Sequence, residues 1–194
     1  LPLPTCIGNE GAGVVLAVGE GVNDFKPGDR VAYGSGPIGS YSTVRNMPAH
    51  PLVKIPDAID FETAAAMMLK GLTAQYLLRR VYKVQAGETI LFHAAAGGVG
   101  TIATQWAKSL GVRVIGTVST REKAELARAN GCAEVIITSE ENVVKRVKEL
   151  TDGKGVPVVY DSVGKATFVD SLDCLKPRGM MVSFGNASGK VDPV

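Results

Sequence analysis

The apolar sequence Thr89-Ile-Leu-Phe-His-Ala94 runs directly into Ala95-Ala-Gly-Gly-Val-Gly100, which is rich in glycine. An almost wholly apolar run of this length is typical of a parallel strand that is covered on both faces. In the G-x-G-x-x-G fingerprint of dinucleotide-binding folds, the first glycine makes a tight turn, the second lets the backbone approach a pyrophosphate, and the third lets helix and strand pack closely. Ala95 takes the first place here, and Gly97 and Gly100 take the other two. The pattern predicts a strand, a phosphate-binding turn and a helix in succession.

The segment after the turn has the apolar periodicity of a helix from Gly98 to Leu110, and Gly111 stands where a left-handed cap belongs. The start of such a helix offers free N–H groups and the positive end of its dipole to a phosphate. The alternative is a structural turn that binds no ligand. We expect the phosphate contact from Gly97, Gly98 and Val99, and a core position for Trp106.

Strands and helices alternate along the chain from Thr89 onward, and a helical run from Glu62 to Arg80 precedes them. Such alternation indicates a doubly wound parallel sheet of the Rossmann type, hence an α/β fold. The expected strands, with four helical segments between them, are Thr89–Ala94, Val112–Val118, Glu134–Ile137, Val156–Tyr160 and Met180–Phe184.

The first 61 residues have a different character, because they are dense in glycine and proline and hold only short β-branched runs. This pattern is typical of short strands joined by tight turns. We expect strands at Val14–Val18, Arg30–Tyr33 and Tyr41–Val44.

The segment after the second strand of the parallel sheet bears on the choice of nicotinamide cofactor. A carboxylate at that strand end normally binds the ribose hydroxyls of NAD, and this chain has none there. Hydroxyls and cations suit the 2′-phosphate of NADPH better, so we expect Lys123, Ser119 and Arg121 to bind it, in that order of preference. Two observations keep the alternative of a solvated helix face open: Glu122 lies between the two cations, and Arg121 and Lys123 start a helix.

The composition of the 194 residues excludes several classes of protein. With 21 basic and 19 acidic residues the net charge is +2, which marks neither a nucleic-acid partner nor a membrane surface. No long apolar run or signal peptide is present, so we expect a cytoplasmic protein. Cys6, Cys132 and Cys174 are too far apart in sequence for a CxxC-type zinc site, and we expect three buried or half-buried free thiols.

The motifs taken together resemble the zeta-crystallin-like quinone oxidoreductases of the medium-chain dehydrogenase/reductase superfamily. The resemblance runs from about Gly8 to Gly189. It rests on the glycine turn after Leu91-Phe-His93, on Lys70-Gly-Leu-Thr73, on Asp161-Ser-Val-Gly164 and on Val182-Ser-Phe-Gly185.

The resemblance implies a Rossmann domain preceded by part of a GroES-like catalytic β domain. Residues 1–68 would be the later part of the GroES-like domain and residues 69–194 the Rossmann domain, without its last strand, so that the chain would be a fragment. The tip of the third strand carries Thr138 where relatives often have tyrosine. The family's cofactor contacts would fall on Thr73, Gly98, Val99, Ser119, Lys123, Ser162, Phe184 and Gly185.

The zinc-binding motif of related alcohol dehydrogenases is altered in this chain. The matching segment reads Gly8-Asn9-Glu10, with Asn9 in place of a ligand histidine, and only His50 and His93 are present. A zinc site needs three or four Cys, His or carboxylate ligands. We therefore expect no metal, and we expect His93 to be a satisfied core residue.

These features predict a zinc-independent oxidoreductase that transfers hydride from NADPH to a small-molecule quinone, and that is a homodimer at full length. One alternative is an enone, alkenal or enoyl-thioester reductase of the same superfamily. Another is a fragment that binds NADPH without turnover. No catalytic residue is assigned: Lys70 and Tyr41 are the remaining candidates for a proton donor, and for each we favour a structural role.

Overall fold

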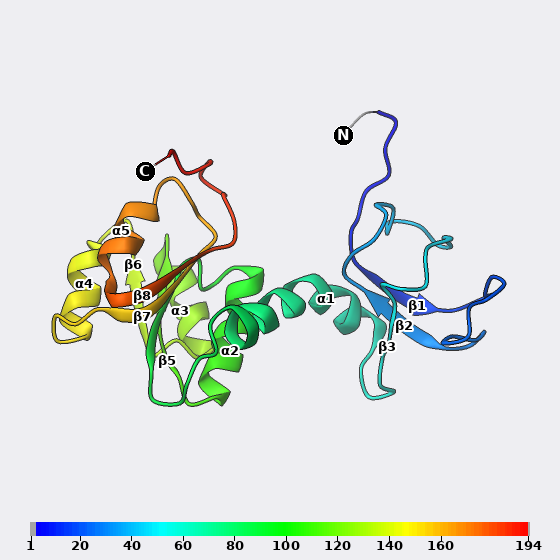
Figure 1. The fold of residues 1–194 in the computed structure, drawn as a ribbon, viewed down its shortest axis with the longest axis horizontal. Helices are drawn as coiled ribbons and strands as arrows, with labels where there is room; N and C mark the ends of the chain where they lie inside the picture. The colour runs from blue at the N-terminus through cyan, green and yellow to red at the C-terminus, as the bar shows by residue number, and fades with distance from the viewer. Residues whose placement is uncertain (1–2, 194) are drawn as a thin grey trace. The chain divides into compact units, whose positions relative to one another are not determined.

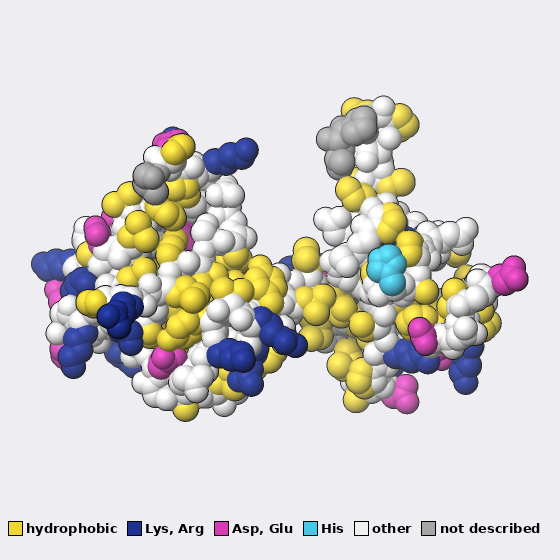
Figure 2. All heavy atoms as spheres, in the orientation of Figure 1, with side chains coloured by type: hydrophobic (Ala, Val, Ile, Leu, Met, Phe, Trp, Pro, Cys, Tyr) yellow, Lys and Arg dark blue, Asp and Glu magenta, His cyan; other side chains and the backbone are white. Residues whose placement is uncertain are grey.

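The computed structural model describes residues 3–193, which form two compact units that divide between Leu72 and Thr73. No helix in the described part of the chain is long and apolar enough to cross a membrane. Figure 2 shows Lys and Arg side chains together with Asp and Glu side chains on the visible surface, which matches the small net charge of +2.

The first unit holds a three-stranded antiparallel sheet in the order β1-β2-β3, with β1 at Gly11–Val14, β2 at Arg30–Tyr33 and β3 at Val53–Lys54. Its core is small, and Val31, Ala32 and Tyr33 of β2 are the buried strand residues. The Arg30 guanidinium lies 4.6 Å from the centre of the Phe61 ring and donates to the carbonyls of Pro56 and Ile59.

Two of the strands expected in this unit are wrong, and one is confirmed. Strand β2 lies where Arg30–Tyr33 was expected. Strand β1 ends at Val14 rather than starting there, because its partner β2 begins at Arg30 and Gly28 turns the chain with a φ of +92°. Residues 41–44 form bends, and the third strand is Val53–Lys54. Short antiparallel strands depend on a partner that a local apolar pattern does not reveal.

The second unit is a five-stranded parallel sheet in the order β6-β5-β4-β7-β8. This order has the earliest strand in the middle and is that of a doubly wound Rossmann sheet, which confirms the fold class. The strands are β4 (Thr89–Phe92), β5 (Arg113–Val118), β6 (Glu134–Ile137), β7 (Val156–Asp161) and β8 (Leu175–Ser183).

The helices cover both faces of this sheet (Figure 1). Helices α2 and α3 contribute their buried alanines to one core, together with Ile90 and Phe92 of β4, whereas α4 and α5 cover the core that holds Leu91. Successive strand residues point to opposite faces, so this division is the expected alternation. The helices are α2 (Gly98–Ser109), α3 (Arg121–Ala129), α4 (Val143–Leu150) and α5 (Phe168–Asp173).

In the second unit the observed strands differ from the expected ones only at their ends. The helical run before the sheet consists of α1 (Phe61–Tyr76) and a π-helical turn η1 at Leu77–Val81. Strand β4 ends at Phe92, because the chain begins to turn at His93. Strand β8 begins at Leu175 rather than Met180, and its pairing with β7 contains a register shift between Val156 and Val158.

Candidate cofactor-binding site

The C-terminal ends of four neighbouring strands bring most of the predicted site residues to one edge of the sheet. In a doubly wound sheet, ligands bind at this edge. The glycine turn (residues 94–100) follows β4, and the Ser119–Lys123 segment follows β5. Ser162 follows β7, and Phe184 and Gly185 follow β8. Thus nine of the ten predicted residues belong to four segments at one edge, and Thr73 is the tenth.

The glycine turn is built by close backbone contacts. Ala94 adopts a left-handed φ of +52°, and its carbonyl accepts a hydrogen bond from the Gly97 N–H at 2.8 Å. A Cβ atom on Gly100 would lie 2.5 Å from the Ala94 carbonyl oxygen and 2.7 Å from Ala95 backbone atoms. Helix and strand therefore approach as closely as the third glycine of the fingerprint allows.

Helix α2 starts at this turn with its first N–H groups left for an external acceptor. Its N-cap is Gly97, which makes no side-chain cap, and its first turn has no acidic residue. The first N–H groups of a helix lack partners within the helix, and they carry the positive end of the dipole. Gly98 and Val99 thus lie in the first turn of a helix suited to bind an anion.

The Ser119–Lys123 segment presents side chains rather than backbone groups. Lys123 Nζ donates to Ser119 Oγ at 3.3 Å, and both side chains are exposed. Thr120 caps α3, since its hydroxyl oxygen accepts from the Lys123 N–H at 3.3 Å. A cation and a hydroxyl held next to each other at the end of β5 suit a phosphate group.

Arg121 of the same segment is already engaged by a carboxylate. Its Nε lies 2.8 Å from Glu140 Oε1 and its Nη2 lies 3.1 Å from Glu140 Oε2, which is a bidentate pair. The hydrogen bonds from Arg121 hold the pKa of the Glu140 carboxyl below its ordinary value. This partner, which comes from the loop after β6, was not foreseen from the sequence. Of the two cations predicted to bind phosphate, Arg121 is held by a carboxylate, whereas among residues 3–193 Lys123 makes no ion pair and donates to the Ser119 hydroxyl.

The turns after β7 and β8 are joined to each other by backbone contacts. The Ala187 N–H donates to the Ser162 carbonyl at 3.1 Å, and the Phe184 N–H donates to the Asp161 carbonyl at 2.9 Å. A Cβ on Gly185 would lie 2.8 Å from the Ser162 carbonyl oxygen, so glycine permits this approach. Ser162 and Gly185 are therefore immediate neighbours at the edge.

A buried polar row lies beneath these segments. The His93 ring makes a 2.9 Å hydrogen bond with Thr117 Oγ1 through Nδ1 and a 3.0 Å hydrogen bond with Ser171 Oγ through Nε2. The Ser171 hydroxyl donates to Asp161 Oδ2 at 2.8 Å. The prediction of a satisfied core histidine is confirmed. The other members of the row were missed, although polar residues at the ends of apolar strands could have revealed them.

Asp161 holds the turn that follows β7. Its Oδ1 accepts from the N–H groups of Val163 at 2.7 Å and Gly164 at 3.0 Å, and its Oδ2 also accepts from the Thr167 hydroxyl at 2.7 Å. Burial raises the pKa of this carboxyl, but the hydrogen bonds from Thr167, Gly164 and Ser171 outweigh it, and the pKa is lowered. Asp161 is therefore an ionised, fully hydrogen-bonded side chain that orders the backbone around Ser162.

Three further candidates belong to segments other than the four strand ends. Thr73 is half-buried on α1. Lys70 Nζ lies 2.6 Å from Glu10 Oε1, and the other oxygen of that carboxylate accepts from the Leu69 N–H, which fits a structural role for Lys70. Tyr41 is 80% exposed.

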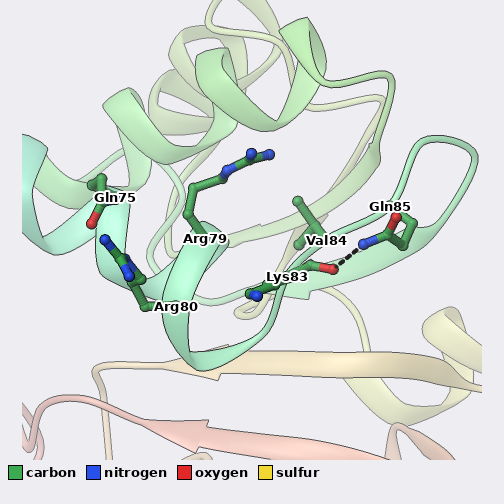
Figure 3. A pocket seen from close by; sticks show the side chains of 6 residues that line it. All are labelled: Gln75, Arg79, Arg80, Lys83, Val84 and Gln85. Atoms are coloured by element: carbon green, nitrogen blue, oxygen red, sulfur yellow. Dashed lines mark hydrogen bonds between the residues drawn. The ribbon is translucent and has the colours of Figure 1, made fainter.

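A hollow of about 460 Å³ lies at the opposite end of the second unit (Figure 3). Its residues come from the end of α1, from η1 and from the loop before β4, and the Gln85 N–H donates to the Glu88 carboxylate just before the strand begins. The hollow is thus at the N-terminal end of β4, where a doubly wound sheet does not bind its cofactor. It is lined by Gln75, Arg79, Arg80, Lys83, Val84 and Gln85.

The exposure of the cysteines differs from the prediction at one position. Cys6 is exposed, because the segment around it stays outside the core, so the expectation that all three thiols are buried or half-buried is wrong. Burial raises the pKa of Cys132 to about 11 and that of Cys174 to about 12. Among residues 3–193, no three His, Cys, Asp or Glu side chains are grouped so that they could hold a metal ion.

Two protein-family models match the chain. Residues 1–57 match the alcohol dehydrogenase GroES-like domain, and residues 98–193 match a model described as zinc-binding dehydrogenase. The fold is therefore a Rossmann sheet preceded by a GroES-like β domain, as predicted.

Similar proteins of known name cover nearly the whole chain. A quinone oxidoreductase of Pseudomonas aeruginosa is 64% identical over 99% of the chain, and a 2-haloacrylate reductase of a Burkholderia species is 52% identical over 98%. The crystal structure of Escherichia coli quinone oxidoreductase complexed with NADPH matches 99% of the chain with a TM-score of 0.96 and 55% identity. The chain spans 58–59% of the length of these relatives.

Proposed function

Because the chain belongs to the quinone oxidoreductase family of the medium-chain dehydrogenase/reductase superfamily, we propose that its protein reduces quinones with NADPH and without zinc. One observation supports the proposal most strongly. The ends of four adjacent strands gather a backbone anion site, a lysine–hydroxyl pair and two ordered turns at the sheet edge where dinucleotides bind.

Each segment of the edge has its own part in the proposed binding. The first N–H groups of α2 bind the pyrophosphate, and the close approach at Gly100 brings the helix near enough to do so. Lys123 and Ser119 bind the 2′-phosphate, and Arg121 contributes less because Glu140 engages it. Ser162, Phe184 and Gly185 border the remainder of the cofactor, and Thr73 remains a proposed contact.

Bound NADPH supplies the hydride, so the protein must chiefly position cofactor and substrate. Quinones accept hydride without strong electrophilic assistance, which agrees with Asn9 at the place of a zinc-ligating histidine. In this proposal residues 1–68 belong to the catalytic domain and residues 69–194 to the Rossmann domain. The cytoplasmic location and the homodimer stay predictions, and light scattering of the full-length protein tests the latter.

Cofactor titration followed by a quinone assay tests the function. We expect NADPH to bind more tightly than NADH, and we expect oxidation of NADPH to require an added quinone. Equal affinity for NADH and NADPH would contradict the assignment of Lys123. Binding of NADPH without turnover would instead support the binding-only alternative.

A second candidate function is the reduction of an electron-poor alkene. It is favoured by the relative from Burkholderia that is named 2-haloacrylate reductase. A comparison of rates on a quinone, an alkenal, an enoyl thioester and 2-haloacrylate decides between the candidates. A rate on any alkene that exceeds the rate on every quinone would replace the first proposal by the second.

A further inference from the structure

His93 is a buried ionisable residue that lies under the cofactor edge, and the proposed function does not use it. It is 1% exposed, directly precedes the glycine turn and follows the last residue of β4. Both ring nitrogens have hydrogen-bond partners, and among residues 3–193 no buried side-chain nitrogen or oxygen lacks one.

The register of the sheet explains the positions of the residues that form the hydrogen-bonded row with His93. Leu91 of β4 pairs with Ile115 of β5 and with Val159 of β7. Two residues further along the chain in each case, His93 just after β4, Thr117 of β5 and Asp161 of β7 come side by side on the face that α4 and α5 cover. Ser171 of α5 fills the space between the ring and the carboxylate.

Asp161 fixes the direction of these hydrogen bonds. An ionised carboxylate only accepts, so the Ser171 hydroxyl uses its proton on Asp161 and must accept from His93 Nε2. The ring therefore carries its proton on Nε2. Burial lowers the pKa of His93 despite the opposing charges of Asp161 and Asp170, so Nδ1 is left as an acceptor for the Thr117 hydroxyl.

The row joins three of the segments that form the proposed site. Thr117 lies two residues before Ser119, and His93 lies immediately before the turn at Ala94. Asp161 holds the N–H groups of Val163 and Gly164, the two residues that follow Ser162. The backbone completes the connection, since Ala95 donates to the Thr117 carbonyl and His93 donates to the Tyr160 carbonyl.

We propose that His93 is a positioning residue of the cofactor site: as a neutral ring with its proton on Nε2, it holds the ends of β5, β4 and β7 in register. The assignment of these ends to NADPH rests on the proposed function. The coupling between them is a property of this chain's own side chains. His93 touches neither cofactor nor substrate in this proposal and acts through Thr117, Ser171 and Asp161.

Four variants of the full-length protein test the role of His93. His93→Leu and Ser171→Ala break the row, whereas His93→Gln keeps an amide N–H near the position of Nε2. Thr104→Val is the matched control, because Thr104 is a buried residue of α2 whose hydroxyl bonds to the Thr101 and Asn130 carbonyls outside the row. Folding of each variant is verified by circular dichroism.

The first measurement is the Kd for NADPH. We expect His93→Leu and Ser171→Ala to raise it by about tenfold, the equivalent of one buried hydrogen bond. We expect His93→Gln to restore most of the affinity and Thr104→Val to leave it unchanged despite a loss of stability. Unchanged affinity in folded His93→Leu and Ser171→Ala overturns the proposal.

The second measurement needs no cofactor. Nitrogen-15 NMR should show His93 with its proton on Nε2, and hydrogen exchange at Val163 and Gly164 should be faster in His93→Leu than in Thr104→Val. A proton on Nδ1 alone, or equal exchange in the two variants, overturns the proposal. If wild type fails to bind NADPH while these signatures hold, the proposed cofactor is wrong and the coupling of the strand ends stands.

Discussion

The glycine turn and the Ser119–Lys123 segment both lie at the sheet edge that we propose to bind the cofactor, yet they are built differently. The glycine turn uses backbone groups, and its shape is fixed by contacts as short as the 2.5 Å between the Ala94 carbonyl and the position of a Cβ on Gly100. The Ser119–Lys123 segment uses exposed side chains, one of which is diverted to Glu140. In the proposed function, binding of the pyrophosphate would thus be tied to the packing of the fold, whereas discrimination between NADPH and NADH would rest on replaceable side chains.

The largest effect is expected from Gly100→Ala. The nearest atoms to the new Cβ belong to the backbone of Ala94 and Ala95, so they cannot move aside, and we expect a loss of about 2–3 kcal/mol in the free energy of unfolding. Urea unfolding followed by the fluorescence of Trp106 measures it, because this single tryptophan lies on α2. Gly19→Ala is the control, since nothing lies within 4 Å of its Cβ position. Equal stability of the two variants would show that the turn is not fixed by packing.

Lys123→Ala should separate recognition from folding. We expect the Kd for NADPH to rise by about tenfold, as for an exposed charge on a phosphate, while the Kd for NADH and the stability stay unchanged. Parallel titrations with the two cofactors measure this. A similar loss for NADH would place Lys123 outside the 2′-phosphate site and remove the contrast between the two regions.

Mild acidification should destabilise the buried hydrogen-bonded row around His93, which lies next to the glycine turn. Burial lowers the pKa of His93 in the folded state, so below its unfolded value of about 6.5 the unfolded state binds the proton more readily. We therefore expect the contribution of His93 to the free energy of unfolding to be fully present above that pH. It should be lost as the pH falls from the unfolded-state pKa toward the lower pKa of the folded state. Unfolding curves on either side of this pH test it, with His93→Gln as the control that lacks the decline. Asp161 titrates below this window, because its pKa is lowered from 3.8.

The smallest effect is expected from Arg121→Ala. Because Glu140 holds the guanidinium by two hydrogen bonds, we expect the Kd for NADPH to change by less than about twofold. Glu140→Ala should instead lower that Kd, since it releases the cation and removes a carboxylate near the proposed phosphate. A larger loss in Arg121→Ala than in Lys123→Ala would reverse the order of the two residues.

The same contrast explains what could be predicted from the sequence. The buried strands β5, β6 and β7 were located to within a residue, because a parallel strand covered on both faces has a continuous apolar run. The start of β8 at Leu175 was missed, because Pro177 and Gly179 resemble a turn and most of its first residues are exposed. The π-helical turn at Leu77–Val81 also went unnoticed, since its spacing resembles that of the preceding helix.

The parts of the site that are local in sequence could be predicted, and those that join distant residues could not. The glycine turn is local, so twelve consecutive residues sufficed to predict its shape. The pairing of Arg121 with Glu140 joins residues 19 apart and depends on where the loop after β6 places a carboxylate. The row from Thr117 to Asp161 required the register of three strands, which the sequence alone does not provide.

The four donors around Asp161 also have an electrostatic consequence. A buried carboxylate usually needs a cation, yet here the Thr117, His93 and Ser171 dipoles align toward it. The Thr167 hydroxyl and two backbone N–H groups complete the shell. These hydrogen-bond donors thus offset the negative charge at the carboxylate itself. The buried Asp161 carboxylate can therefore lie beneath a sheet edge that we propose to bind NADPH, without strongly repelling the phosphates of the cofactor. It also needs no buried cation, for which those phosphates would compete with the carboxylate.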